Sequence, residues 1–150
     1  MNVKVLGYLR TAREVAPEMV QRKWGRIINV SGLAARSTGT IIGSMRNVSV
    51  AALTKNIADE LAGTGVSAVC IHPGLTRTEK TPGVAAKTAE KLGISVADAE
   101  AQMASKNLTK RLITADDIAA VAAFVASPRS VAINGDVIAA GGGAPGSIHY

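Results

Sequence analysis

Gly25-Arg26-Ile27-Ile28-Asn29-Val30-Ser31-Gly32 is an apolar run that ends in a small polar turn. A helical pattern follows from about Ser44 to Ala62, and a second apolar run, Val66 to Ile71, stops at Pro73-Gly74. Two strands joined by a helix form a parallel βαβ unit, whose crossover is nearly always right-handed. Because ligands of open α/β sheets bind beyond the carboxyl ends of the strands, we expect a site in the segments that follow these two strands.

Helices and one further strand are predicted in the rest of the chain. Residues 3–23 carry apolar side chains three or four positions apart, which predicts an amphipathic helix. Residues 33–42 are small and polar and predict a loop, whereas residues 75–83, rich in Thr, Lys and Pro, predict a mobile connection. The remaining elements are predicted in the order helix, helix, strand, at 96–107, 115–126 and 136–140. The fold class is therefore α/β, with a parallel sheet of about three strands flanked by helices.

Composition limits the kind of protein that this chain can be. Its 150 residues, 47% of them hydrophobic, fit a single domain over 1–150 with a real core. The net charge is +6, but the basic residues are spread out among carboxylates, so we expect no nucleic-acid partner. No apolar run reaches membrane-spanning length and the amino terminus lacks a secretory pattern, which predicts a cytoplasmic protein without a membrane partner. Cys70 is the only cysteine, so neither an intramolecular disulfide nor a metal site is expected.

The helix predicted at 44–62 has an unusually wide apolar surface. One stripe runs along Val50, Leu53, Ile57 and Leu61, and several alanines widen it. One side of such a helix would face the sheet. The other side implies a partner helix, in the same chain or in another copy.

Four segments in this order resemble the carboxyl-terminal half of the short-chain dehydrogenase/reductase family. They are Gly25-Arg26-Ile27-Ile28-Asn29-Val30-Ser31, Ala52-Leu53-Thr54-Lys55, Pro73-Gly74-Leu75-Thr76-Arg77-Thr78 and Ile133-Asn134-Gly135-Asp136-Val137-Ile138. The resemblance implies a partial Rossmann-like sheet and hydride transfer between NAD or NADP and a small carbonyl or alcohol substrate. It also implies a homo-oligomer that pairs through the two long helices.

The same resemblance assigns site residues. The family contacts the nicotinamide end of the cofactor with a turn that corresponds here to Pro73, Gly74, Thr76 and Thr78. A tight turn that only ends a strand would have a similar sequence. Ser31 falls near the family's catalytic serine, with Gly32 as the alternative register. A serine at a strand end is also a common turn-forming residue.

Two departures from the family pattern limit what the chain can be expected to do. The family's glycine-rich turn, which seats the dinucleotide pyrophosphate, has no counterpart. The catalytic Tyr-x-x-x-Lys falls at Gly43 and Asn47, and the family's asparagine on the preceding helix falls at Lys4. Gly43 cannot transfer a proton, and Asn47 supplies no cation.

We therefore expect a divergent member that is incomplete or inactive as this chain alone. A non-catalytic structural or oligomerisation module is the alternative from another class. Within enzymology, a reductase or dehydratase-like activity could use Arg46, Ser44 or His72 in place of the tyrosine.

Overall fold

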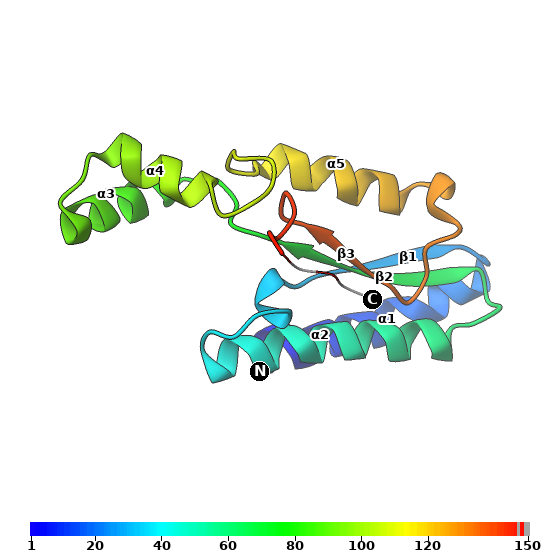
Figure 1. The fold of residues 1–150 in the computed structure, drawn as a ribbon. Coiled ribbons are helices and arrows are strands. Elements are labelled where there is room, and N and C mark those ends of the chain that lie inside the picture. The colour runs from blue at the N-terminus through cyan, green and yellow to red at the C-terminus, as the bar shows by residue number, and fades with distance from the viewer. Residues whose placement is uncertain (147, 149–150) are drawn as a thin grey trace.

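The computed structural model describes residues 1–146 and 148. These residues form two long helices, three strands, three further helices and short helical turns (Figure 1). The elements in chain order are η1 (Asn2–Leu6), α1 (Gly7–Gln21), β1 (Gly25–Val30), η2 (Leu33–Ala35), α2 (Ile41–Glu60), β2 (Val66–Pro73), α3 (Thr81–Leu92), α4 (Val96–Ala104), α5 (Ala115–Ala126), η3 (Pro128–Ser130) and β3 (Val137–Ala140). Within the described residues, no helix has the length and hydropathy that crossing a membrane requires.

The three strands form one parallel sheet in the order β1-β2-β3. Gly25 pairs with Val66 at the start of the first ladder, and Pro73 pairs with Ala140 at the end of the second. The central strand β2 is buried along nearly its whole length, as expected when helices cover both faces of a sheet. The predicted α/β class and parallel sheet are thus confirmed.

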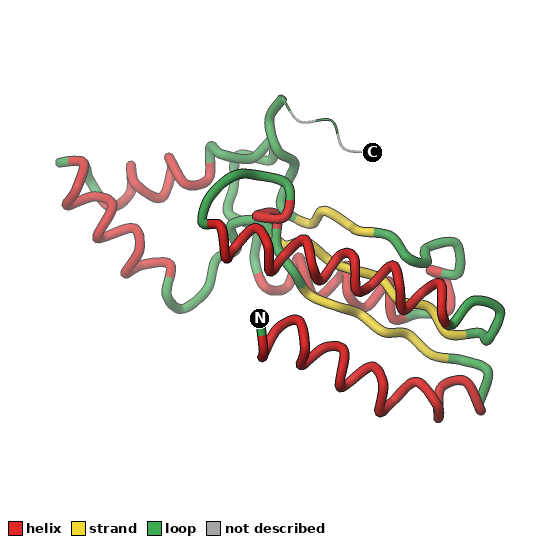
Figure 2. Tube along the Cα trace, turned by 90° about the horizontal axis from the view of Figure 1, so that it is seen from below, coloured by secondary structure: helices red, strands yellow, loops and turns green. Residues whose placement is uncertain are grey.

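Helices cover the two faces of the sheet unequally. Helix α5 lies on one face, and α1 and α2 lie side by side on the other (Figures 1 and 2). The main core lies between the sheet and these two helices, and it contains Ala12, Ile27, Ile57, Ala58, Val66 and Ala68. Cys70 is fully buried, and burial raises the pKa of its thiol to about 11, so the side chain behaves as a small hydrophobic group.

Helices α3 and α4 pack against each other and project beyond the end of the sheet (Figure 1). They enclose a small core of their own, made of Ala85, Met103 and Leu112. The sequence interpretation missed α3, because it took residues 75–83 for a mobile connection. Pro82 lies in the first turn of this helix, where its missing N–H costs nothing, so the proline that suggested a loop begins a helix.

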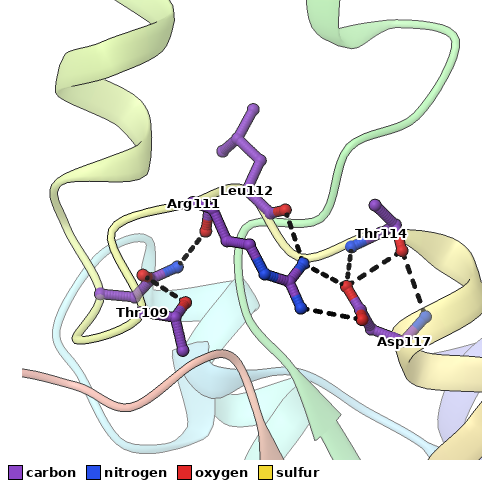
Figure 3. Close-up of polar contacts among 6 residues, drawn as sticks. Thr109, Arg111, Leu112, Thr114 and Asp117 are labelled. Carbon is purple, nitrogen blue, oxygen red and sulfur yellow. Dashed lines mark hydrogen bonds and ion pairs between the residues drawn. The ribbon is translucent and has the colours of Figure 1, made fainter.

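The turn between α4 and α5 is held by a compact polar network (Figure 3). Thr114 caps α5: its Oγ1 accepts from the Asp117 backbone N–H at 3.2 Å, and the Asp117 carboxylate accepts from the Thr114 N–H at 2.8 Å. Arg111 donates to both Asp117 oxygens, at 2.6 and 3.0 Å. These bonds to the charged form hold the pKa of Asp117 well below its usual range. The network fixes the chain just before the helix that covers one sheet face.

Replacing Thr114 by Ala should lower the free energy of unfolding by about 1 kcal/mol, because it removes the capping oxygen. Urea unfolding followed by circular dichroism measures this. Thr88→Ala is the matched control: its hydroxyl only donates back to the Val84 carbonyl within α3 at 2.9 Å, so its effect should be within about 0.5 kcal/mol. Equal losses in the two variants would contradict the capping role.

Candidate functional site

The three strands end close together at one edge of the sheet. The Ser31 backbone N–H, directly after β1, donates to the Ile71 carbonyl of β2 at 2.8 Å. After β2, Gly74 touches the end of β3: a Cβ on Gly74 would lie 2.8 Å from Gly141 Cα. Glycine is therefore needed at 74 for this close approach, independently of any ligand. This edge is where open α/β sheets bind their ligands.

A polar cluster, consisting of Lys4, Ser31 and Asn47, lies at the end of β1. The Lys4 ammonium donates to the Ser31 carbonyl at 3.0 Å and to Asn47 Oδ1 at 2.9 Å. Ser31 Oγ lies 3.1 Å from the same Oδ1 and 3.0 Å from the Asn47 carbonyl, and it donates to one of them. Asn47 is buried at 5% exposure, so its amide is a fixed part of the cluster. The three side chains come from η1, the turn after β1 and α2.

Positive charge dominates the surroundings of this cluster. Burial and the neighbouring Arg46 guanidinium both lower the pKa of Lys4. Arg46 Nε is itself buried and has no hydrogen-bond partner in the described part of the chain. Neither cation forms an ion pair with a carboxylate there. Such a site favours a ligand that brings an acceptor oxygen or a negative charge.

The turn after β2 is anchored rather than mobile. Its residue Thr76 forms a parallel bridge with Ile113, and the Arg77 N–H donates to the Ile113 carbonyl at 2.7 Å. Arg77 also pairs with Glu100 of α4 at 2.7 Å. The expectation of a mobile connection at 75–83 was therefore wrong, because this turn is pinned to the segment before α5 and then enters α3.

The two threonine hydroxyls of this turn make local bonds. Thr76 Oγ1 donates to the Gly74 carbonyl at 3.1 Å, and Thr78 Oγ1 accepts from the Lys80 N–H at 3.3 Å. The backbone N–H groups of Leu75 and Thr76 find no acceptor among residues 1–146 and 148. These two N–H groups are therefore the donors of the turn that remain free for a ligand.

His72, the residue before the end of β2, lines a separate cavity of about 530 Å³. The cavity is also lined by Arg36 of the turn after η2, Val48 of α2 and Asp136 before β3. His72 is only 1% exposed, and neither ring nitrogen has a partner in the described structure. Burial, with Arg36 and Lys4 nearby, lowers its pKa to about 4, so the ring is neutral at physiological pH.

The structure brings together some of the expected site residues and separates others. Ser31 lies in the cluster, Pro73 ends the neighbouring strand, and Gly74 follows it. Thr78 lies further out, where the turn enters α3, and the Ser44 hydroxyl donates to the Ser37 carbonyl at the surface. Lys4 is the residue that the sequence interpretation undervalued. It was counted only as a lost asparagine, although a lysine at that position and an asparagine at 47 together suggest an exchange.

The arrangement defines a class: a parallel α/β domain with a polar site at the carboxyl ends of its strands. Comparison with known proteins narrows the class. A family model described as enoyl-(acyl carrier protein) reductase matches residues 1–145. The NADPH-dependent reductase BacG of Bacillus subtilis (strain 168) is 33% identical over 147 residues, which cover 97% of this chain and 57% of BacG. NADPH-dependent aldehyde reductase 2, chloroplastic, of Arabidopsis thaliana is 34% identical over 146 residues, covering 95% of this chain and 50% of that reductase.

Solved structures agree with these sequence matches. The crystal structure of YwfH, an NADPH-dependent reductase involved in bacilysin biosynthesis, superposes with a TM-score of 0.86 at 32% identity over 97% of this chain and 56% of that chain. L-Sorbose reductase from Gluconobacter frateurii, complexed with NADPH and L-sorbose, gives a TM-score of 0.87 at 22% identity over 97% and 56% of the two chains and shares the fold. The chain belongs to the short-chain dehydrogenase/reductase family. It spans about half the length of the curated relatives it matches.

Proposed function

We propose that this chain forms the substrate-side half of an NAD(P)-dependent oxidoreductase that acts on a small carbonyl or alcohol compound. The reductase names of its relatives support this assignment. In the proposal, Ser31 binds the reacting oxygen, and Pro73, Gly74, Thr76 and Thr78 form the turn that receives the nicotinamide. A cytoplasmic location is part of the proposal and fits the buried free thiol of Cys70.

The turn after β2 fits the nicotinamide end of such a cofactor. The free N–H groups of Leu75 and Thr76 can donate to a carboxamide oxygen, and Gly74 keeps the backbone free of a side chain there. A bound reduced nicotinamide would supply the hydride. The pyrophosphate end has no comparable seat, because no strand precedes α1 in the described structure and a glycine-rich strand-to-helix turn is therefore lacking there.

The edge of β1 is the observation that carries the proposal of a missing half. Within residues 1–146 and 148, β1 pairs only with β2, and a groove of about 360 Å³ runs along its other side. The Val30 carbonyl on that side accepts a hydrogen bond from the Tyr8 hydroxyl, at 3.0 Å. An open edge beside the strand that carries Ser31 favours pairing with a further strand. We infer that a nucleotide-binding segment docks here, whether from the same or another polypeptide.

Calorimetric titration of NADPH and NADH into the chain tests this inference. We expect no micromolar binding to the chain alone. The second arm is a fusion in which the part of BacG that precedes its matched region is joined to this chain. The fusion should bind NADPH at micromolar concentration and oxidise it when an aldehyde or ketone is added. Micromolar binding by the chain alone would refute the missing half, and a fusion that binds NADPH without turning over any carbonyl would refute the redox function.

An oligomerisation module remains the second candidate, because α2 exposes large apolar side chains. These are Ile41, Ile42, Met45 and Val48, exposed by 49% to 78%. Contacts between copies through α1 and α2 would bury them. Sedimentation of the chain and of Val48→Glu tests this, with Val84→Glu on α3, a valine of similar exposure, as the control. A monomeric parent chain, or an oligomer that survives Val48→Glu, would argue against this interface.

A further inference from the structure

We propose that Lys4 is the acid of this site: its ammonium binds the substrate's carbonyl oxygen and transfers the proton that a phenol would otherwise supply. The inference rests on the proposed redox function and deepens it by assigning the proton donor. It also predicts a substrate oxygen that develops negative charge during the reaction.

The cluster and its neighbour Arg46 leave several hydrogen-bond donors without acceptors. The Lys4 ammonium has three N–H groups, and two of them are held by the Ser31 carbonyl and Asn47 Oδ1 at 3.0 and 2.9 Å. The third is available. Asn47 Nδ2 makes no hydrogen bond within the described structure, and Arg46 Nε is buried without an acceptor. An oxyanion bound beside Lys4 would supply the acceptor that these donors lack, and donors already in place when charge develops are the ones that stabilise it most.

The charged groups around Lys4 favour an anionic ligand. A half-buried ammonium usually has a carboxylate partner, but Lys4 instead has a second cation, Arg46, as its charged neighbour. The other titratable groups that face it are Cys70 and His72 of β2, both uncharged at neutral pH. The arrangement lacks the negative charge that an incoming oxyanion would bring. It also makes proton release from Lys4 easier than from a solvated lysine.

Lys4 and Asn47 carry each other's residue type relative to the family pattern. The resemblance places a lysine at 47 and an asparagine at 4, whereas this chain has Asn47 and Lys4. The structure joins these two side chains by a hydrogen bond of 2.9 Å. The cation has therefore moved from α2 to the start of the preceding helix while staying beside Ser31. An exchange that preserves contact indicates a retained site more than two independent losses do.

The chemistry then balances. A reduced nicotinamide cofactor, when bound, would supply hydride to the carbonyl carbon and leave as the oxidised nicotinamide, while the C=O π electron pair moves onto oxygen. That oxygen takes a proton from Lys4 Nζ, which leaves a neutral amine and an alcohol. The Ser31 backbone carbonyl and Asn47 Oδ1 hold Lys4 in place, and the amine regains its proton from water. In the reverse direction, the neutral Lys4 amine takes the alcohol proton.

The test on the full 150-residue chain uses NMR of the lysine Cε signals, with Lys4→Arg to identify the Lys4 signal. Acetate is the probe, because its oxygens mimic the developing oxyanion. Acetate should shift the Lys4 signal saturably and leave that of Lys55 unchanged, since Lys55 is exposed and paired with Asp59 at 2.7 Å. Lys4 should also titrate below Lys55, because burial lowers the pKa of Lys4 and the Asp59 carboxylate raises the pKa of Lys55. A Lys4 signal that acetate does not move, or moves no more than the others, overturns the proposal.

Turnover of the BacG fusion gives the second readout. Lys4→Met should lower kcat by ~10²-fold to 10⁴-fold and remove the limb of the pH profile at which the acid loses its proton. Tyr8→Phe is the control, because that phenol contacts the Val30 carbonyl next to the cluster, and it should keep the profile. An active fusion in which Lys4→Met retains full kcat overturns the inference alone. A parent fusion without turnover defeats the redox function, while the acetate titration still decides whether Lys4 binds an oxyanion.

Discussion

Gly65→Ala should lower the free energy of unfolding by about 3 kcal/mol, the largest change we expect from one methyl group in this chain. Gly65 has a φ of +86°, and a Cβ there would lie 2.1 Å from the Lys23 carbonyl oxygen. Backbone atoms cannot yield as the end of a flexible side chain can. The turn before β2 and the turn before β1 would have to separate, although the ladder begins beside them with Gly25 paired to Val66.

Gly63→Ala is the matched control, two residues earlier in the same turn. Its φ is +74°, but a Cβ there would meet nothing within 4 Å. This substitution should lower the free energy of unfolding by about 1 kcal/mol. The loss comes from the left-handed backbone, and the lower entropy of the unfolded chain partly offsets it. Urea unfolding of the two variants isolates the collision. Equal losses would mean that the two turns do not touch. The register of the ladder sets the relative positions of Ser31 and Pro73 at the strand ends. Gly65 therefore also affects the geometry of the site.

The strands could be predicted because a short stretch of sequence contains the apolar pattern that defines them. Continuous apolar runs such as Val66 to Ile71 have one stable place in a domain this size, which is a parallel sheet covered on both faces. Helix α3 could not be recognised in the same way. Its first turn carries Thr81 and Pro82, which are equally common in loops. Its buried residue Ala85 packs against Met103 of α4 and Leu112, which are distant in the sequence. The α3–α4 pair is stabilised by a tertiary contact that no short window contains.

Boundaries were displaced for similar reasons. Helix α2 begins at Ile41 instead of Ser44, because the Thr40 hydroxyl accepts from the Gly43 N–H at 3.1 Å and caps an earlier start. Strand β2 continues through Pro73, where the partner strand β3 still pairs with it. In both places the deciding group lies just outside the apolar pattern.

The polar site shows the limit of position-by-position reasoning. Ser31 was expected at the strand end and lies there. The sequence interpretation dismissed Lys4, because position 4 considered alone shows only that an asparagine has been lost. What matters is that Lys4 and Asn47, 43 residues apart, share a hydrogen bond. Only a fold, or attention to both positions at once, joins the two substitutions into one feature.

The pH dependence of stability should carry a distinct contribution from His72. Its pKa is about 4 in the folded chain against 6.5 for an ordinary histidine, because burial and the cations Arg36 and Lys4 oppose its protonation. Between these values the unfolded chain binds a proton that the folded chain does not, so unfolding becomes easier as the pH falls. The full contribution is present above pH 6.5 and is lost as the pH falls from 6.5 to about 4.

We expect this loss to reach about 2 kcal/mol, less than the whole pKa difference would give, because the adjoining cavity lets water approach the ring. Urea unfolding at intervals from pH 7.5 to about 4 measures it, and His72→Gln is the comparison, since an amide keeps polar atoms in the cavity without titrating there. Every other titratable group is common to the two proteins, so the difference between the two curves isolates His72. Parallel curves would mean that the imidazole is protonated as easily in the folded chain as in water. The cavity would then have to be far wetter than a 1%-exposed ring without partners implies.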